Sequence, residues 1–202
     1  MVDRWAVVTD DPLVTNSDDA ALPVSATTER RVRWVSLAGR PLASLVAGDL
    51  VEARARSGLD LPGFFVSEQA RRLWRDRFDQ VTADPASAPW VARAAVSEPD
   101  GAVVGYAGYH GPPNEDGMVE IGYTVVPEAR RRGYARAMLR SLLVRAAEEP
   151  DVHVVRVTIS PDNAASLATI RGFGFVEMGE HVDEELGLGI IHEVPAGRVL
   201  GI

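Results

Sequence analysis

Hydrophobic and polar positions change their period in the middle of the chain, from that of a strand to that of a helix. Residues 119–126 are rich in β-branched and aromatic side chains, which is typical of a strand. Pro127 lacks a backbone donor and is expected to end this strand. From Arg131 onward, apolar residues recur at the spacing of one helix face: Ala135, Met138, Leu139, Leu142, Leu143 and Ala146. The pattern predicts a strand, a sharp turn and a long helix.

The chain before this unit is predicted to begin its ordered part with a strand and a short helix. Residues 31–37 alternate between polar and apolar, as a half-buried strand does. Pro41 suits the first turn of a short helix that ends before Gly48. Residues 49–65 contain Gly58, Pro62 and Gly63 and are expected to be irregular. A loop of this kind near a site often shapes the acceptor pocket.

A longer helix is expected over residues 68–81, because Ser67 can cap its N-terminus. Its apolar stripe is predicted to include Phe78, whereas its arginines, Arg77 among them, are expected to face solvent. Asn163 can cap one further short helix. Runs of β-branched and aromatic residues predict the remaining strands: residues 90–96, 103–109, 152–159, 175–181 and 188–194.

The order of these elements predicts a mixed α/β fold, with an antiparallel meander first and βαβ-like crossovers after it. Residues 1–31 show no clear period and are interpreted as a partly ordered N-terminal leader, in which residues 5–9 could form a short strand. Residues 32–202 are interpreted as a single domain, since their length is enough for one sizeable core.

The turn between the central strand and helix carries the most informative chemistry. Arg130, Arg131 and Arg132 stand together before Gly133, and glycine lets a ligand approach the backbone closely. The first amides of a helix have no internal partner and lie at the positive end of its dipole. Three arginines are unfavourable there unless an anion binds, so the turn is predicted to bind a phosphate or pyrophosphate. The alternative is a solvated basic helix end.

Charge and composition narrow the class of ligand. The net charge of −8 argues against general binding to nucleic acids or anionic membranes, and it suits a cationic substrate such as an amine. The chain has no cysteine and no long apolar run, which favours a cytoplasmic location. Its four histidines lack metal-ligand spacing, so no metal is expected, and His110 alone is a candidate for the acceptor side. All 21 basic residues are arginine, which favours a GC-rich bacterial genome.

Two motifs in this order resemble those of a known family. They are Arg130-x-x-Gly133-x-Ala135 after the Glu-Ile-Gly-Tyr strand, and Asn163-Ala-Ala-Ser166 followed by Gly-Phe-Gly-Phe. Together they resemble the GCN5-related N-acetyltransferase (GNAT) superfamily, most closely the ribosomal-protein-N-terminal-acetyltransferase (RimJ/RimL-like) subgroup, over roughly residues 32 to 195. The resemblance implies a mostly antiparallel sheet of about six to seven strands with about four flanking helices. It also implies that the motif strand splays from the strand beside it.

The resemblance implies an acetyl-CoA-dependent N-acetyltransferase that acts on a primary amine, either a peptide N-terminus or a small molecule. The backbone of Val125, with Val126 beside it, would pair with pantetheine. Asn163 and Ser166 would contact the coenzyme. The turn that would hold the pyrophosphate comprises Arg130, Arg131, Arg132, Gly133, Tyr134 and Ala135.

The resemblance also suggests two catalytic residues. Glu120, on the strand face opposite Ile121 and Tyr123, is the candidate base, and the alternative is a surface glutamate. The family's usual tyrosine, seven residues after the motif asparagine, is replaced by Ile170, so Ser166 is the candidate proton donor to the thiolate. Asn163 and Ser166 could instead only cap a helix. Tyr123 and Tyr134 are interpreted as packing residues.

Two other functions remain open from the sequence. The missing tyrosine would suit a noncatalytic acyl-CoA-binding or regulatory module of the same fold. A generic nucleotide-phosphate binder would prefer ATP or NAD to coenzyme A. The resemblance is also compatible with a homodimer, and the acceptor itself would be set by residues 49–65, residues 110–117 and the final hairpin.

Overall fold

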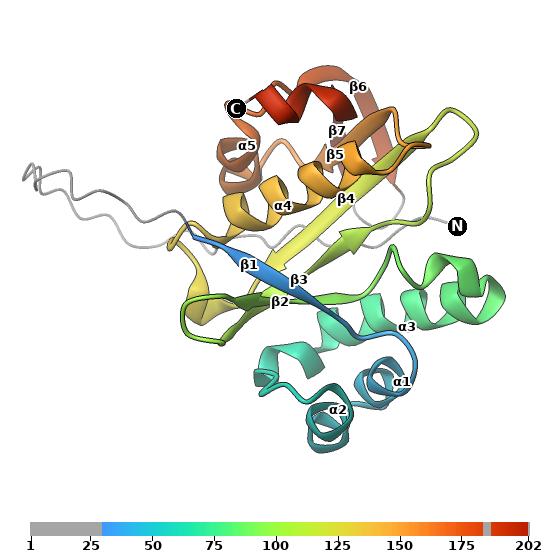
Figure 1. Ribbon diagram of the computed structural model, residues 1–202, viewed down its shortest axis with the longest axis vertical. Coiled ribbons are helices and arrows are strands. Elements are labelled where there is room, and N and C mark those ends of the chain that lie inside the picture. The colour runs from blue at the N-terminus through green and yellow to red at the C-terminus, as the bar shows by residue number, and fades with distance from the viewer. Residues whose placement is uncertain (1–29, 184–186, 202) are drawn as a thin grey trace, which may run out of the picture.

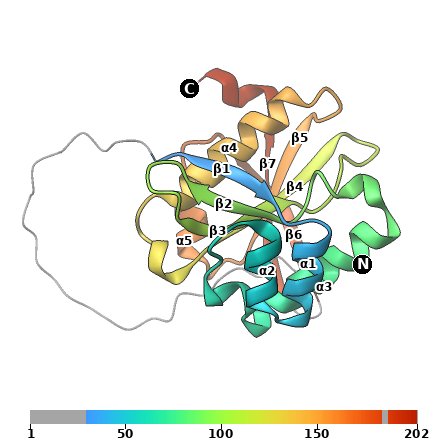
Figure 2. The same ribbon diagram turned by 60° about the horizontal axis from the view of Figure 1, so that its bottom comes forward.

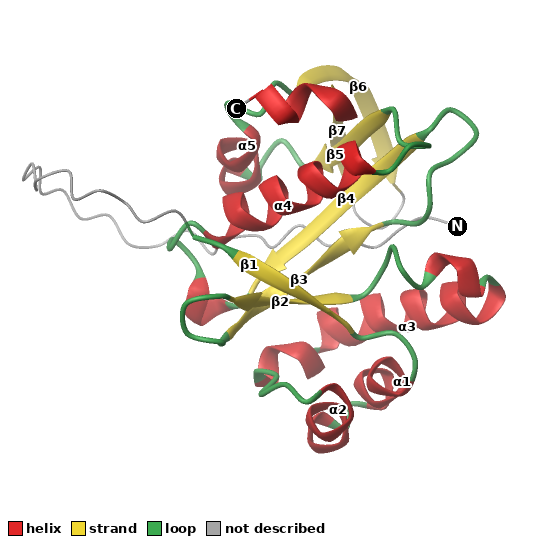
Figure 3. Ribbon diagram, in the orientation of Figure 1, coloured by secondary structure: helices red, strands yellow, loops and turns green. Residues whose placement is uncertain are grey.

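The computed structural model describes residues 30–183 and 187–201. The leader expected at residues 1–31, with its short strand at residues 5–9, lies almost wholly outside the described residues. The described chain builds one sheet of seven strands with helices on both faces (Figures 1 and 3). Within these residues, no helix is both long enough and apolar enough to span a bilayer.

The sheet follows the predicted order of a meander and then crossovers. Four strands pair consecutively and antiparallel: β1 (Val32–Ser36), β2 (Arg93–Ser97), β3 (Val103–Tyr109) and β4 (Met118–Val125). The other three complete the order β1-β2-β3-β4-β5-β7-β6: β5 (Val154–Ile159), β6 (Val176–Asp183) and β7 (Gly187–Pro195). Among the described strands, only the β4–β5 pair is parallel, which confirms the mixed, mostly antiparallel sheet.

Within the described residues, five α-helices cover the sheet, one more than the approximate number that the resemblance implies: α1 (Arg40–Ala47), α2 (Leu50–Ser57), α3 (Glu68–Ala83), α4 (Tyr134–Glu148) and α5 (Ala164–Ile170). Figure 2 shows α1, α2 and α3 together in front of the sheet, while α4 crosses behind it. Ser67 caps α3 as predicted, since its hydroxyl accepts a hydrogen bond from the Ala70 amide.

The stretch predicted to be irregular, residues 49–65, contains helix α2 and a short 3-10 turn, so that prediction is wrong. The Asp49 side chain accepts a hydrogen bond from the Glu52 amide at 2.9 Å and begins α2. Gly58, at φ +67°, ends it. Ala53 is the only fully buried residue of α2, so the sequence offers no apolar stripe by which to recognise this helix.

Arg77 and Phe78 on α3 have exchanged the environments expected for them. Arg77 is 2% exposed, whereas Phe78 is 37% exposed. The buried stripe of α3 begins at Ala70, Leu73 and Trp74, and Arg77 continues that period. Its guanidinium donates to the His110 carbonyl and to the Gln80 amide oxygen, so burial costs it less than it would cost an isolated charge.

Buried aromatic contacts define which face each strand residue takes. Tyr106 of β3 packs edge-on against Trp74 of α3, with ring centroids 4.7 Å apart. Tyr109, three residues later, lies on the other face and donates to the Leu142 carbonyl of α4 at 2.6 Å. Because Thr124 pairs directly opposite Tyr106, the even residues of β4 face the α3 side and the odd residues face the α4 side.

Strands β4 and β5 part from one another after three paired positions. Met118, Val119 and Glu120 pair with β5, whereas β4 continues to pair with β3 as far as Val125. In the part of the chain that the structure describes, the β5 side of residues 121–125 therefore has no strand partner. This splay confirms the expectation for the motif strand, and it opens the sheet where the predicted site lies.

Candidate active site

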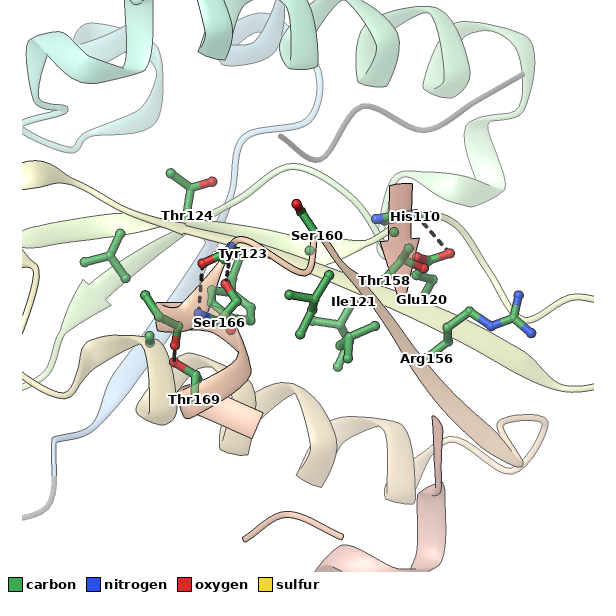
Figure 4. A pocket seen from close by; sticks show the side chains of 18 of the residues that line it. His110, Glu120, Ile121, Tyr123, Thr124, Arg156, Thr158, Ser160, Ser166 and Thr169 are labelled. Carbon is green, nitrogen blue, oxygen red and sulfur yellow. Dashed lines mark hydrogen bonds and ion pairs between the residues drawn. The ribbon is translucent and has the colours of Figure 1, made fainter. Parts of the chain in front are cut away.

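A cavity of about 1030 Å³ occupies the gap between β4 and β5 and extends to the starts of α4 and α5. Figure 4 shows two groups of polar side chains on its wall, with Tyr123, Ser166 and Thr169 at one end and His110, Glu120 and Arg156 at the other. Most predicted site residues line it: Glu120, Val125, Arg130, Arg131, Gly133, Tyr134, Ala135, Asn163 and Ser166. Val126 and Arg132 do not line this cavity.

The turn before α4 has the backbone of an anion site. Helix α4 begins at Tyr134 rather than near Arg131, and Gly133 is its N-cap residue at φ +85°. Arg131 also has a positive φ of +57°, which is unusual for a residue with a side chain and is often found at binding sites. Within the described chain, no acceptor is assigned to the amides of residues 131–136. These amides are therefore available to a phosphate.

The arginine side chains of the turn lie in different places. Arg130 lines the cavity, and its Nε donates to the Val125 carbonyl at 3.3 Å. Arg131 lines the cavity and is exposed. Arg132 lies over the ring of Tyr134, 5.6 Å from its centroid. Tyr134 is buried, and its hydroxyl pairs with that of Ser97 at 3.1 Å, so its side chain packs the turn as expected.

Backbone hydrogen bonds show which edge of β4 faces the gap. The Val126 amide donates to the Val104 carbonyl at 3.0 Å, and the His110 amide donates to the Glu120 carbonyl at 2.8 Å. Even residues of β4 therefore bond to β3, and the backbone groups of odd residues point to the β5 side. Val125 is the odd residue at the end of the gap that adjoins the arginine turn.

Asn163 and Ser166 form a reciprocal cap at the start of α5. The Asn163 side-chain oxygen accepts from the Ser166 amide at 3.0 Å, and its NH₂ group donates to the Ser166 hydroxyl oxygen at 2.8 Å. The capping role that the sequence left open is thus present. It does not use the hydrogen of the Ser166 hydroxyl, which can still be donated toward the cavity.

Tyr123 also lines this end of the cavity, although the sequence predicts only a packing role for it. Its hydroxyl oxygen is buried and has no hydrogen-bond partner among the described residues. Burial raises the pKa of the Tyr123 hydroxyl, while the hydroxyls of Ser166 and Thr169 act in the opposite direction. Tyr123 is therefore a neutral donor at the end of the cavity that contains Ser166.

At the other end, Glu120 lies beside His110. Their Oε2 and Nδ1 atoms are 3.5 Å apart, and both side chains are largely shielded, at 21% and 16% exposure (Figure 4). Burial, and then the charge of Arg77, holds the pKa of His110 well below its usual range. A neutral His110 can present an N–H to the carboxylate of Glu120. Glu120 lies on the face of β4 opposite Ile121 and Tyr123, and its role as the base stays a prediction; the sequence does not predict its pairing with His110.

Arg156 of β5 pairs with Glu120 in the strand register, but its guanidinium forms an ion pair with Glu193. Its Nε and Nη2 donate to one carboxylate oxygen of Glu193 on β7, at 2.9 and 2.6 Å. The sequence contains no local signal for this pair, because β5 and β7 are brought together only by the sheet order. Among the described residues, no group of three or more acidic or histidine side chains is arranged to hold a metal ion.

Comparison with known proteins agrees with this geometry. A family model described as an acetyltransferase (GNAT) domain matches residues 49–176. Over 74 residues, the chain is 32% identical to YjdG, an uncharacterized N-acetyltransferase of Bacillus subtilis (strain 168). That alignment covers 37% of this chain and 44% of the relative, so the chain matches less than half of that relative's length.

Solved structures share the fold at low sequence identity. A spermidine N-acetyltransferase of Vibrio cholerae, in complex with CoA and spermine, has a TM-score of 0.60 at 15% identity and covers 85% of this chain and 99% of that chain. A proposed ribosomal-protein-serine acetyltransferase of the same organism has a TM-score of 0.53 at 15% identity, with 84% and 95% covered. These likenesses concern the fold alone.

Proposed function

The chain belongs to the family of GNAT acetyltransferases, and from this premise we propose that it transfers an acetyl group from acetyl-CoA to a primary amine. The observation that carries the proposal is the gap between β4 and β5, which joins the turn before α4 to the carboxylate of Glu120. Both substrates can meet in this one cavity. Direct attack in a ternary complex then needs no covalent enzyme intermediate, which suits a chain without cysteine.

The residues present fit acetyl-CoA, which supplies an acetyl group activated as a thioester when it is bound. The amides of residues 131–135 offer donors for the pyrophosphate, and Arg130 and Arg131 add charge at the cavity wall. The backbone of Val125 would pair with pantetheine, and Asn163 would contact the coenzyme. Val126 and Arg132 do not line the cavity. Val126 would support Val125, and Arg132 would add positive charge near the pyrophosphate.

Glu120 is proposed to remove the proton from the attacking amine. Its side chain reaches the cavity from the α3 side of β4, whereas Tyr123 lies on the opposite side of the strand. An α-amino group has a reference pKa of roughly 7.7–8.0 and needs little help to lose its proton. His110 would orient the Glu120 carboxylate through its N–H. On the other side, Ser166 would donate to the departing sulfur.

The acceptor is proposed to be cationic before it reacts, as a small-molecule amine or a peptide N-terminus. Glu120 lines the acceptor end, and the charge of Arg156 in that wall is balanced by Glu193. The acceptor end thus carries more negative than positive charge among these groups, and it would attract an ammonium group. The bound spermine in the related fold supports an amine acceptor, and the second Vibrio cholerae structure supports the ribosomal-protein subgroup.

A second candidate is the noncatalytic acyl-CoA-binding module. It is favoured by Ile170, which is buried at the position where the family usually has its tyrosine. We further propose that the protein works in the bacterial cytoplasm, without nucleic acid or membrane, and that it forms a homodimer.

Acetyl-CoA titration by calorimetry, followed by thiol release with a panel of amines and N-terminal peptides, tests the proposal. Binding with release on one acceptor supports the enzyme and gives its substrate class. Binding without release on any acceptor favours the noncatalytic module. No binding, or tighter binding of ATP or NAD than of coenzyme A, contradicts both.

A matched pair of variants locates the binding. Gly133→Ala and Gly58→Ala both place a side chain at a positive φ at the end of a helix, so both should lose stability to a similar extent, about 1 kcal/mol. Only Gly133 lines the cavity. Gly133→Ala should therefore weaken acetyl-CoA binding at least about tenfold, whereas Gly58→Ala should leave it unchanged.

A further inference from the structure

Among the four tyrosines of the chain, Tyr123 is the one whose buried hydroxyl makes no hydrogen bond of good geometry within the described residues, and the nearby hydroxyls of Ser166 and Thr169 act only on its pKa. The Tyr109 hydroxyl donates to the Leu142 carbonyl, and that of Tyr134 pairs with Ser97. The Tyr106 hydroxyl interacts with Thr124. All four residues lie in the described part of the chain. A buried hydroxyl without a partner costs about 1–3 kcal/mol, so a ligand atom that accepts its hydrogen would recover this energy.

The position of Tyr123 limits which ligand atom can accept a hydrogen bond from its hydroxyl. Tyr123 is three residues from Glu120 along β4, about 10 Å, and on the opposite side of the strand. It shares its end of the cavity with Ser166 at the start of α5 (Figure 4). If the amine approaches from the Glu120 side, the leaving group departs toward the side of Tyr123. An electron-rich leaving atom is the partner that a neutral phenol would stabilise.

We propose that Tyr123 donates the proton that the coenzyme sulfur takes up when the acetyl group leaves. This inference rests on the proposed function. The amine nitrogen forms the new C–N bond and gives its proton to Glu120, while the C–S bond breaks and its electron pair stays on sulfur. Tyr123 transfers its phenolic proton to that sulfur. The resulting tyrosinate regains a proton from solvent, and Glu120 releases one, so protons balance over a turnover.

In this scheme Ser166 donates a hydrogen bond to the departing sulfur, and Tyr123 supplies the proton. A phenol is a stronger acid than an aliphatic alcohol, and the Ser166 oxygen is already held by the Asn163 NH₂ group. Tyr123 also remains protonated at working pH, because burial raises the pKa of its hydroxyl. Ile170 replaces the family's usual tyrosine on α5. In this scheme Tyr123 on β4 supplies the phenol for the sulfur instead.

The sharpest test uses free coenzyme A rather than turnover. The pKa of the bound thiol can be followed by the ultraviolet absorbance of the thiolate in wild type, Tyr123→Phe and Tyr109→Phe. Tyr109 is a buried tyrosine of β3 that does not line the cavity, so its variant is the matched control. Donation by Tyr123 should give the wild type and Tyr109→Phe a thiol pKa about one pH unit below that of Tyr123→Phe. Equal values in all three proteins would overturn the inference.

Kinetics and stability give the second test. With an acceptor that wild type acetylates, Tyr123→Phe should lower kcat at least about tenfold without changing the affinity for acetyl-CoA. Without ligand, it should be at least as stable as wild type, because no internal hydrogen bond is lost, whereas Tyr109→Phe should be less stable. Undiminished kcat in Tyr123→Phe would refute the role of Tyr123 and leave the proposed function intact. Failure of wild type to bind acetyl-CoA would instead refute the proposed function, and the inference with it.

Discussion

Glu120 is the residue on which the proposed chemistry depends most directly. If its carboxylate removes the amine proton, Glu120→Gln should lower kcat/KM by about 100-fold or more at a pH below the pKa of the acceptor amine. The loss should shrink at higher pH, where the free amine is already neutral. A pH profile of initial rates for both proteins checks this. A uniform loss at every pH would show that Glu120 orients the acceptor rather than accepting its proton.

His110 provides a pH test that does not need a substrate. Its pKa is lowered in the folded protein, mainly by burial, so below a pH of about 6.5 the unfolded chain binds the extra proton and the folded chain does not. Folding stability should therefore fall as the pH drops. At one pH unit below that value, the loss from this group approaches about 1.4 kcal/mol.

Urea denaturation at neutral pH and at about pH 5.5 measures this loss. In His110→Gln, the part of the loss that belongs to this imidazole should disappear, while His153→Gln, at an exposed position, should behave as wild type does. An unchanged pH dependence in His110→Gln would show that the buried imidazole is not kept neutral, and it would weaken the orienting role proposed for its N–H.

At the scale of single helices, variants of two N-cap residues distinguish a loss of stability from a loss of acetyl-CoA binding. Asn163 begins α5 and Asp49 begins α2, and each side chain accepts from the amide three residues later. Asn163→Ala and Asp49→Ala should each reduce the free energy of unfolding by about 1 kcal/mol. Calorimetry should find weaker acetyl-CoA binding for Asn163→Ala alone. Equal binding in both variants would limit Asn163 to capping.

The elements that the sequence predicts best are those whose period can be seen locally. Strand β4 and the apolar face of α4 follow from spacing alone. Arg77 is buried, against the prediction, because its place in the period of Ala70, Leu73 and Trp74 outweighs the preference of its charge for solvent. The pairing of His110 with Glu120 depends on the β3–β4 register, and the uncommitted hydroxyl of Tyr123 depends on where α5 packs. Neither arrangement is encoded in residues that are neighbours in sequence.

The splay between β4 and β5 divides the sheet of the molecule into two parts. The three paired positions of β4 and β5, and helices across the gap, hold these parts together. A ligand in the cavity touches β4, β5, α4 and α5 at once. It should therefore stabilise residues 32–202 as one cooperative unit, with a single transition that moves to higher temperature. At a ligand concentration of 100 times its Kd, the gain in the free energy of unfolding is about 2.7 kcal/mol.

Calorimetric melting with and without acetyl-CoA measures that shift, and ATP at the same concentration serves as the comparison. A larger shift with acetyl-CoA than with ATP would mean that the gap beyond the phosphates contributes to binding, because the pyrophosphate turn alone should accept either ligand. Equal shifts would mean that only the turn before α4 is occupied, which argues against a pantetheine site along Val125. Two separate transitions, of which the ligand moves only one, would contradict the interpretation of residues 32–202 as a single domain.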